Sequence, residues 1–157
     1  MFPNVSHAQL CVIPKELFQK EKVVDYWSAL FDAPILRENL GIDDLDNCVL
    51  LYPNSHGTVF RHIVSFMYHE MKEKFPNYPH AICMNLHENA LNFLAVNDHH
   101  IVYAGHFECS TNEDILYHLS NISQHFFQNI SKINYFYKQL PHPVLRLLRS
   151  YYDMNEL

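Results

Sequence analysis

Histidine is the side chain in this sequence with the clearest capacity for chemistry. The chain has 12 histidines among 157 residues, and neutral imidazole is a common ligand of zinc and other transition metals. Two pairs are seven residues apart: His62 with His69, and His118 with His125. Helical metal ligands lie one turn apart, as in HExxH, so neither pair has that spacing. His87, His100 and His106 could converge across a sheet, but we expect scattered histidines and no metal site.

Cysteine offers a second kind of chemistry. The four cysteines are Cys11, Cys48, Cys83 and Cys109, and none form a CxxC pair. Their apolar surroundings predict buried free thiols and a reducing, cytoplasmic compartment. Only Cys109 lies near a predicted helix start, and the sequence has no GxSxG elbow. We therefore expect no catalytic nucleophile.

The elements that position these residues are clearest in the second half of the chain. Alternating or continuous apolar residues predict three strands, over 81–87, 90–96 and 101–107, separated by turns at Glu88-Asn89 and Asn97-Asp98. In the first of these strands Asn85 lies on the face opposite Ile82 and Met84. Two short turns between three strands predict an antiparallel meander.

A helix follows this meander. Ser110 and Glu113 have the spacing of a capping box, which predicts where the helix begins. We expect the helix to extend to about Asn129. Apolar residues then recur at helical spacing, at Ile115, Leu119, Ile122 and Phe126. One stripe of the helix is therefore predicted to pack on the sheet.

The flanking segments are less regular. We expect strands over 8–13, 48–52 and 133–137, helices over 15–31, 58–75 (with Thr58 as N-cap) and 143–152, and an irregular polar segment over 32–47. The prolines of 76–79 divide the chain into a partial first lobe, residues 1–80, and a second lobe, residues 81–157. We expect strand, helix, strand, helix in the first, and the meander, a helix, a strand and a helix in the second.

Three antiparallel strands followed by a helix open the ribonuclease H-like fold, which is also the fold of actin-like ATPases. From Cys11 to Leu157 the chain resembles the DUF3822 family, an uncharacterised bacterial family common in Bacteroides relatives. The matching segments are 13–18, 81–96, 100–103 with Phe107, and 112–117. The resemblance implies an α/β fold of the actin-like ATPase type, with a mixed sheet and helices on its faces.

The same resemblance locates the place where a nucleotide would bind. In actin-like ATPases an Asp ends the first strand of each lobe and organises Mg²⁺, and a following turn with Gly and hydroxyl residues binds phosphate. The corresponding stretch here runs from Asn85 through Glu88 to Asn89, with Asn in place of Asp and no Gly, Ser or Thr. A nucleotide, if it bound, would contact these three residues. Ribonuclease H chemistry needs converging carboxylates, and Asn85 is not one.

Composition and charge indicate which kinds of partner and binding site are disfavoured. The formal net charge is −6 and the pI is about 6.0, which disfavours nucleic acid or an anionic membrane as partner. With 3 glycines, the chain is poor in the residue that phosphate loops require. We expect a cytoplasmic, non-catalytic scaffold or protein-interaction module without a cofactor. The alternative is a degenerate actin-like ATP-binding protein.

The first lobe is expected to be incomplete. An actin-like lobe begins with a strand hairpin, and the sequence shows none before residue 81, so the chain resembles a shortened family member. A missing hairpin leaves an exposed sheet edge. We therefore expect either a homodimer along that edge or a rearranged first lobe, with any other protein partner unknown. The chain also ends at Leu157, where the fold would normally add another strand.

Overall fold

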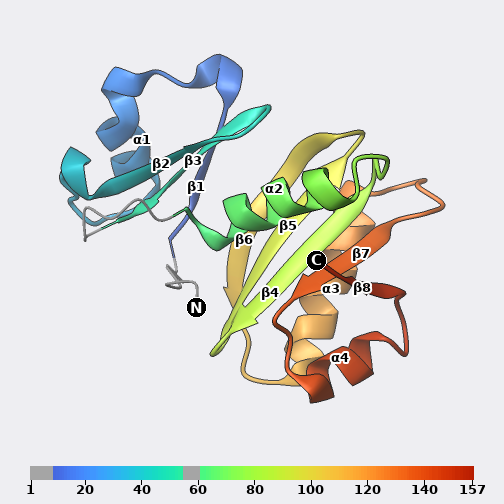
Figure 1. Ribbon diagram of the computed structural model, residues 1–157. Helices are drawn as coiled ribbons and strands as arrows, with labels where there is room; N and C mark the ends of the chain where they lie inside the picture. Colours follow the sequence, from blue (N-terminus) through green and yellow to red (C-terminus); the bar gives the residue numbers. More distant parts are fainter. Residues whose placement is uncertain (1–8, 55–60) are drawn as a thin grey trace.

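The computed structural model describes residues 9–54 and 61–157. Figure 1 shows a small three-stranded sheet beside a larger five-stranded sheet. The small sheet has the order β1-β3-β2 and is antiparallel throughout. Its strands are β1 (Cys11–Pro14), β2 (Leu40–Asp44) and β3 (Cys48–Pro53). Helix α1 (Val23–Leu30) covers this sheet, because Val23 and Trp27 share a buried cluster with its strands.

The helix predicted over 15–31 is wrong in its first half. Two 3₁₀ turns, Lys15–Leu17 and Lys20–Lys22, stand there instead, with extended backbone at Phe18 and Gln19 between them. The hydroxyl of Tyr26 explains the break, because it accepts the main-chain N–H of Gln19 at 3.0 Å and donates to a carbonyl in the first turn at 2.6 Å. These main-chain groups are therefore satisfied outside an α-helix.

The segment predicted to be irregular over 32–47 contains a further 3₁₀ turn, Arg37–Asn39, and strand β2. The strand forms despite its acidic residues because Asp43 is satisfied there: it accepts the hydroxyl of Tyr52 and the main-chain N–H of His62, each at 3.0 Å. Gly41 fits beneath the Tyr52 ring, where a Cβ would lie 2.3 Å from Cε2. A hairpin, β2–β3, therefore follows α1 in this lobe.

The larger sheet has the order β6-β5-β4-β7-β8. Its strands are β4 (Ala81–His87), β5 (Ala90–Asn97), β6 (His100–Glu108), β7 (Asn134–Lys138) and β8 (Met154–Glu156). The first three form the predicted antiparallel meander, and β7 and β8 run parallel to β4. Helices α3 (Asn112–Phe126) and α4 (His142–Leu148) cover one face of this sheet, and α2 (Ile63–Lys74) covers the other. The predicted mixed α/β architecture is confirmed.

The cap of α3 is displaced by one residue from its prediction. Thr111, and not Ser110, is the N-cap, and its capping-box partner is Asp114 instead of Glu113. The Asp114 carboxylate accepts the N–H groups of Ser110 and Thr111, both at 2.8 Å. The predicted stripe is confirmed, with Ile115, Leu119 and Ile122 buried. The shift arises because two neighbouring hydroxyl residues and two neighbouring acids offer two registers of the same motif.

Other boundaries also differ from the sequence predictions. The second meander turn is Asp98-His99, where both residues have positive φ, of 50° and 63°. Helix α4 ends at Leu148, and β8 supplies the strand that the sequence predicted to be missing. Thr58 lies outside the described residues, and His62 is the N-cap of α2, with its ring nitrogen accepting from Val64.

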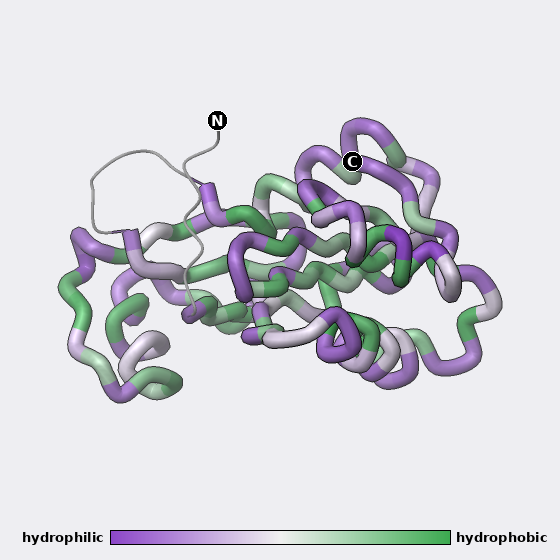
Figure 2. Tube along the Cα trace, turned by 90° about the horizontal axis from the view of Figure 1, so that it is seen from below, coloured by the Kyte–Doolittle hydropathy of each residue, from purple (hydrophilic) through white to green (hydrophobic). Residues whose placement is uncertain are grey.

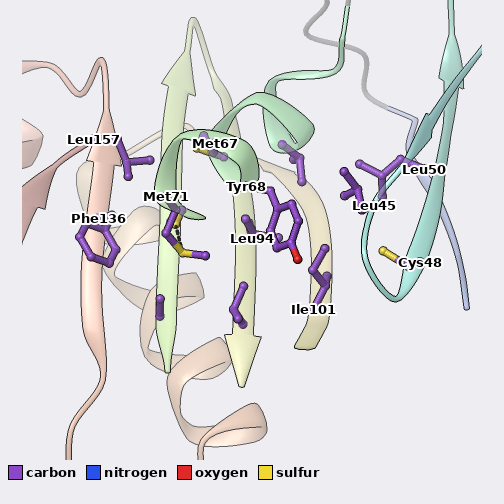
Figure 3. Packing of buried hydrophobic residues seen from close by; sticks show 14 of the residues in the cluster. Leu45, Cys48, Leu50, Met67, Tyr68, Met71, Leu94, Ile101, Phe136 and Leu157 are labelled. Atoms are coloured by element: carbon purple, nitrogen blue, oxygen red, sulfur yellow. Dashed lines mark hydrogen bonds between the residues drawn. The ribbon is translucent and has the colours of Figure 1, made fainter. Parts of the chain in front are cut away.

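The two sheets share one buried core. Helix α2 belongs by sequence to the predicted first lobe, residues 1–80. Its residues Val64, Met67 and Met71 nevertheless pack on the five-stranded sheet of the second lobe. Residues of the small sheet join the same cluster, as Figure 3 shows for Leu45, Cys48 and Leu50. Hydrophobic residues lie mainly along the strands, and hydrophilic residues lie mainly in the connections (Figure 2). Within 9–54 and 61–157, no helix has the length and hydropathy needed to cross a bilayer.

Candidate functional site

The strand end at Asn85 is where, by the resemblance to actin-like ATPases, a nucleotide would be expected if one bound. Asn85 lies on β4, on the face covered by α2, and is 2% exposed. Its partners across the sheet are Asn92 on β5 and Lys138 on β7. The Asn85 Nδ2 donates to the carbonyl of Lys138 at 2.9 Å, and its Oδ1 accepts from Asn92 at 3.5 Å. The amide is therefore used inside the sheet.

A partly buried ion pair lies at the same end of the sheet. The ammonium of Lys138 is paired with the carboxylate of Glu70 on α2, and both side chains are about 15% exposed (14% and 16%). Lys74 donates to the other Glu70 oxygen at 2.8 Å. The Lys138 ammonium also lies 4.6 Å from the centre of the Phe66 ring, within cation–π range.

The electrostatic balance at Glu70 follows from these contacts. Burial alone raises the pKa of a carboxyl group, because it disfavours the charged form. The hydrogen bonds and charges of Lys138 and Lys74 together outweigh burial, and the pKa of Glu70 lies below its ordinary value. The carboxylate is thus held ionised by two lysines, and both of its oxygens have partners.

Glu88 and Asn89 form the exposed tip of the β4–β5 hairpin. Glu88 has a positive φ of 53° in this turn. The carbonyl of Asn89 accepts the N–H of Cys109 at 2.8 Å, which ties the hairpin to the end of β6. Asn85 is bonded to Lys138 and Asn92 inside the sheet, whereas Glu88 and Asn89 lie at the exposed hairpin tip. That a bound nucleotide would contact these three residues stays a prediction.

The histidines of the described residues are dispersed over the fold. Residues 9–54 and 61–157 contain no group of three or more His, Cys, Asp or Glu side chains placed to hold a metal ion. Individual histidines have local roles, as when His62 caps α2 and His118 stacks on Phe107 with ring centres 3.9 Å apart.

The cysteines are all buried and free, as predicted. Burial, followed by the nearby Asp114 carboxylate, raises the pKa of Cys109 to about 11. Burial raises the pKa of Cys48 to about 11 as well. A thiol with a raised pKa has little thiolate at neutral pH, which is the form that attacks.

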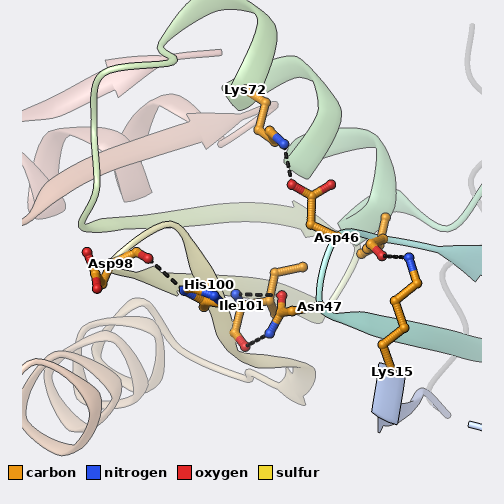
Figure 4. Close-up of polar contacts among 8 residues, drawn as sticks. Lys15, Asp46, Asn47, Lys72, Asp98, His100 and Ile101 are labelled. Atoms are coloured by element: carbon orange, nitrogen blue, oxygen red, sulfur yellow. Dashed lines mark hydrogen bonds and ion pairs between the residues drawn. The ribbon is translucent and has the colours of Figure 1, made fainter.

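A further polar contact, which no sequence pattern indicates, lies at the junction of the two sheets. The side-chain amide of Asn47, just before β3, faces the main chain of Ile101 at the start of β6 (Figure 4). Its Nδ2 donates to the Ile101 carbonyl at 3.0 Å, and its Oδ1 accepts the Ile101 N–H at 3.0 Å. Two such bonds are what the next strand of an antiparallel sheet would supply. The residues are 54 positions apart, so no local pattern could have indicated the pair.

The rest of that strand edge can be assigned by alternation. Strand β6 is an edge of the five-stranded sheet, and β5 is its neighbour. The N–H of Cys109 points toward β5, because it donates to Asn89. Since main-chain groups alternate along an antiparallel strand, those of Ala104, His106 and Glu108 point away from β5. A bulge opposite Ala95 and Val96 inserts one extra residue into β6 and shifts this alternation by one position. The main-chain groups of Ile101 therefore also point away from β5, toward Asn47.

Comparison with known proteins supports the fold. No family model matches the chain, and no curated protein matches it. A crystal structure of a Bacteroides thetaiotaomicron protein with an actin-like ATPase fold and unknown function is similar, with a TM-score of 0.75 and 16% sequence identity. The match covers 96% of this chain and 65% of that one, so this chain spans about two thirds of its neighbour's length. The predicted actin-like ATPase fold is thereby confirmed.

Proposed function

We propose that this chain is a non-catalytic protein-interaction module built on the actin-like ATPase fold. The fold itself does not decide function, because related folds host many activities. The proposal rests on the residues at two places, the strand end at Asn85 and the outer edge of β6. The same proposal includes three further points: the chain resembles the DUF3822 family, it is a shortened member of that family, and it is located in the cytoplasm.

The buried amide of Asn85 is the observation that carries the non-catalytic part. Nucleotide hydrolysis in this fold needs a carboxylate at this point to organise Mg²⁺. A neutral amide whose Nδ2 donates to the Lys138 carbonyl offers no negative charge to a cation. Glu70, the carboxylate that reaches this end of the sheet, is held by Lys138 and Lys74. Binding Mg²⁺ would require breaking those pairs.

The outer edge of β6 supports the interaction part. An edge strand with free N–H and C=O groups is a template for pairing with another chain. Between Ala104 and Glu108, no described residue bonds the outward main-chain groups of β6. Proteins commonly blunt such edges with lysine, proline or a covering segment, and β6 contains neither lysine nor proline.

A thermal-shift experiment tests the absence of nucleotide binding. The chain is heated with ATP, ADP or AMP, each with and without Mg²⁺, and separately with Zn²⁺. A ligand at 100 times its dissociation constant stabilises by about 2.7 kcal/mol, which raises the melting temperature of a domain of this size by roughly 5 to 10 °C. We expect no shift above 1 °C, taken as about the scatter of the assay, with any of these ligands.

A Mg²⁺-dependent rise with ATP would contradict the proposal. The matched variants Glu88→Gln and Glu113→Gln would then locate the site, since both carboxylates are exposed but only Glu88 lies in the β4–β5 turn. Loss of the shift in Glu88→Gln alone would assign the chain to the degenerate ATP-binding proteins.

A further inference from the structure

We propose that the outer edge of β6 binds an extended segment of a partner protein as an additional strand. This inference rests on the proposed interaction function and names its surface and the chemistry of its partner. The main-chain groups of the edge, the hollows on both sides of it and the surrounding charge all favour such a strand.

The chain already binds one peptide-like group at this edge. The carboxamide of Asn47 has the same donor and acceptor as a peptide bond, and it forms both hydrogen bonds to Ile101 at 3.0 Å. The next outward groups, at Ala104 and His106, are without such a partner among the described residues. A peptide backbone that continues past Asn47 would bond these groups in the same way.

Two hollows flank this edge, and Tyr103 lines both. The first has a volume of about 380 Å³ and lies between the small sheet and β6, lined by Val12, Pro14 and Cys48 on one side and by Ile101 and Ala104 on the other. The second has a volume of about 540 Å³ and lies between β6 and α3. A bound strand points its side chains alternately to opposite faces. Main-chain bonds with pockets for alternate side chains are the features of recognition by strand addition.

The second hollow has an aromatic floor. The rings of Tyr103 and Phe107 are stacked at 12°, with centres 6.2 Å apart, and Phe126 lies 5.4 Å from Tyr103. Gly105 between them leaves room for this arrangement, because a Cβ there would lie 2.6 Å from the Tyr103 hydroxyl. Flat, uncharged rings bordered by Asn121 and the amides of α3 favour an apolar or aromatic side chain of the partner.

The charge around the edge indicates which partner strand fits. Neither hollow is lined by lysine or arginine. Glu16 lines the first hollow, and Glu108 ends β6, and both are exposed. With a net charge of −6, the chain would repel an acidic segment. The partner is therefore an extended segment with apolar side chains on both faces, lysine or arginine at its ends and no acidic residue.

A labelled peptide of this chemistry tests the inference. The probe is the blocked heptapeptide Lys-Val-Tyr-Val-Tyr-Val-Lys, and fluorescence anisotropy measures its binding to the full chain. His106→Pro removes an outward N–H without removing a bond to β5, whereas His106→Gln keeps that N–H. We expect His106→Pro to weaken binding by about tenfold or more, and His106→Gln to change it by about twofold or less.

Two N-methylated probes make the test independent of variant folding. One carries methyl groups on the amides of residues 2, 4 and 6, and the other on those of residues 3 and 5. A strand that pairs with β6 loses binding in one of these peptides, the one whose methyl groups point at the edge, and retains it in the other.

Three results would overturn the inference. The first is no binding of the probe, and the second is equal binding by the proline and glutamine variants together with equal binding of both methylated peptides. The third is a dimer, seen in sedimentation, that occupies the β6 edge and excludes the probe. The last result would assign the edge to a second copy. None of these depends on nucleotide, so a Mg²⁺–ATP thermal shift would contradict the proposed function separately.

Discussion

The side-chain amide of Asn47 forms two hydrogen bonds to the main chain of Ile101, one from Nδ2 to the carbonyl and one from the N–H to Oδ1, both 3.0 Å long. This pair joins the small sheet to the edge of the large one (Figure 4). It also satisfies the first outward pair of main-chain groups on β6 and leaves the following ones open. One residue therefore both connects the two sheets and defines where the open edge begins.

Asn47→Asp is predicted to destabilise the chain. The substitution removes the Nδ2 donor, leaves the Ile101 carbonyl without its partner and places a carboxylate against that oxygen. We expect the free energy of unfolding to fall by about 1 to 3 kcal/mol, as measured by urea denaturation. Asn121→Asp on the exposed surface of α3 is the matched control, with an expected change within about 0.5 kcal/mol. Equal effects of the two variants would contradict the assigned role of Asn47.

The ion pair between Glu70 and Lys138 predicts a pH dependence. The folded state holds the pKa of Glu70 below its ordinary value, so the pair contributes its full stability above that value. The contribution is lost as the pH falls through the lowered pKa, because the protonated carboxyl no longer attracts the lysines.

Glu70→Gln is therefore expected to lower the free energy of unfolding by about 1 kcal/mol at pH 7 and by progressively less below pH 4.5, the ordinary pKa of the group. Glu73→Gln, an exposed position on the same helix, should leave the pH profile unchanged. A difference between Glu70→Gln and the native chain that stays constant down to pH 2, about where carboxyl titration is complete, would refute the assignment.

The two structurally described glycines predict opposite tolerances to alanine. At Gly41 a Cβ would meet the ring of Tyr52 at 2.3 Å, and that ring is 1% exposed and packed in the shared core. We expect Gly41→Ala to lower the free energy of unfolding by about 2 kcal/mol or more, since a buried ring must move.

Gly105→Ala is the matched comparison. Its Cβ would meet the Tyr103 hydroxyl, the outer end of a half-buried side chain that can turn away. We expect a loss below about 1 kcal/mol, together with a change in the tyrosine environment seen by near-UV circular dichroism. Similar losses for the two variants in urea denaturation would show that the Tyr52 ring is not fixed as described.

The thiols are predicted to be unreactive in the folded chain. All four are buried, and burial raises the pKa of Cys48 and of Cys109 to about 11. Ellman's reagent at pH 8 should label none of them on a timescale faster than unfolding, and all four after denaturation. Rapid labelling of any single cysteine in the native chain would contradict its burial.

Four of the five strands of the large sheet, together with helix α3, could be predicted from the sequence because their signals are local, whereas β8 was not predicted. Alternating apolar residues from Ala81, short turns and a helix stripe at Ile115 and Leu119 each specify one element and its buried face. Even there the observed capping box, Thr111 with Asp114, is one residue away from the predicted one, because the neighbouring Ser110 and Glu113 fit the same motif.

The small sheet was harder to predict because long-range contacts determine it. The hydroxyl of Tyr26 interrupts a segment with helical periodicity, and Tyr52 together with His62 stabilises an acidic strand at Asp43. The pairing of Asn47 with Ile101 likewise joins residues 54 positions apart. Single asparagines carry no sequence signal for such contacts, so the open edge of β6 emerged only from the three-dimensional arrangement.

Amide hydrogen exchange along β6, followed by NMR on the uniformly labelled chain, tests the central claim most directly. The claim is that this edge is open beyond the Asn47 contact. The account predicts slow exchange for Ile101, which is bonded to Asn47, and for Tyr103, Gly105 and Phe107, which face β5, with fast exchange for Ala104 and His106. Equally slow exchange at Ala104, Gly105 and His106 would show that the edge is already covered, and would contradict the account.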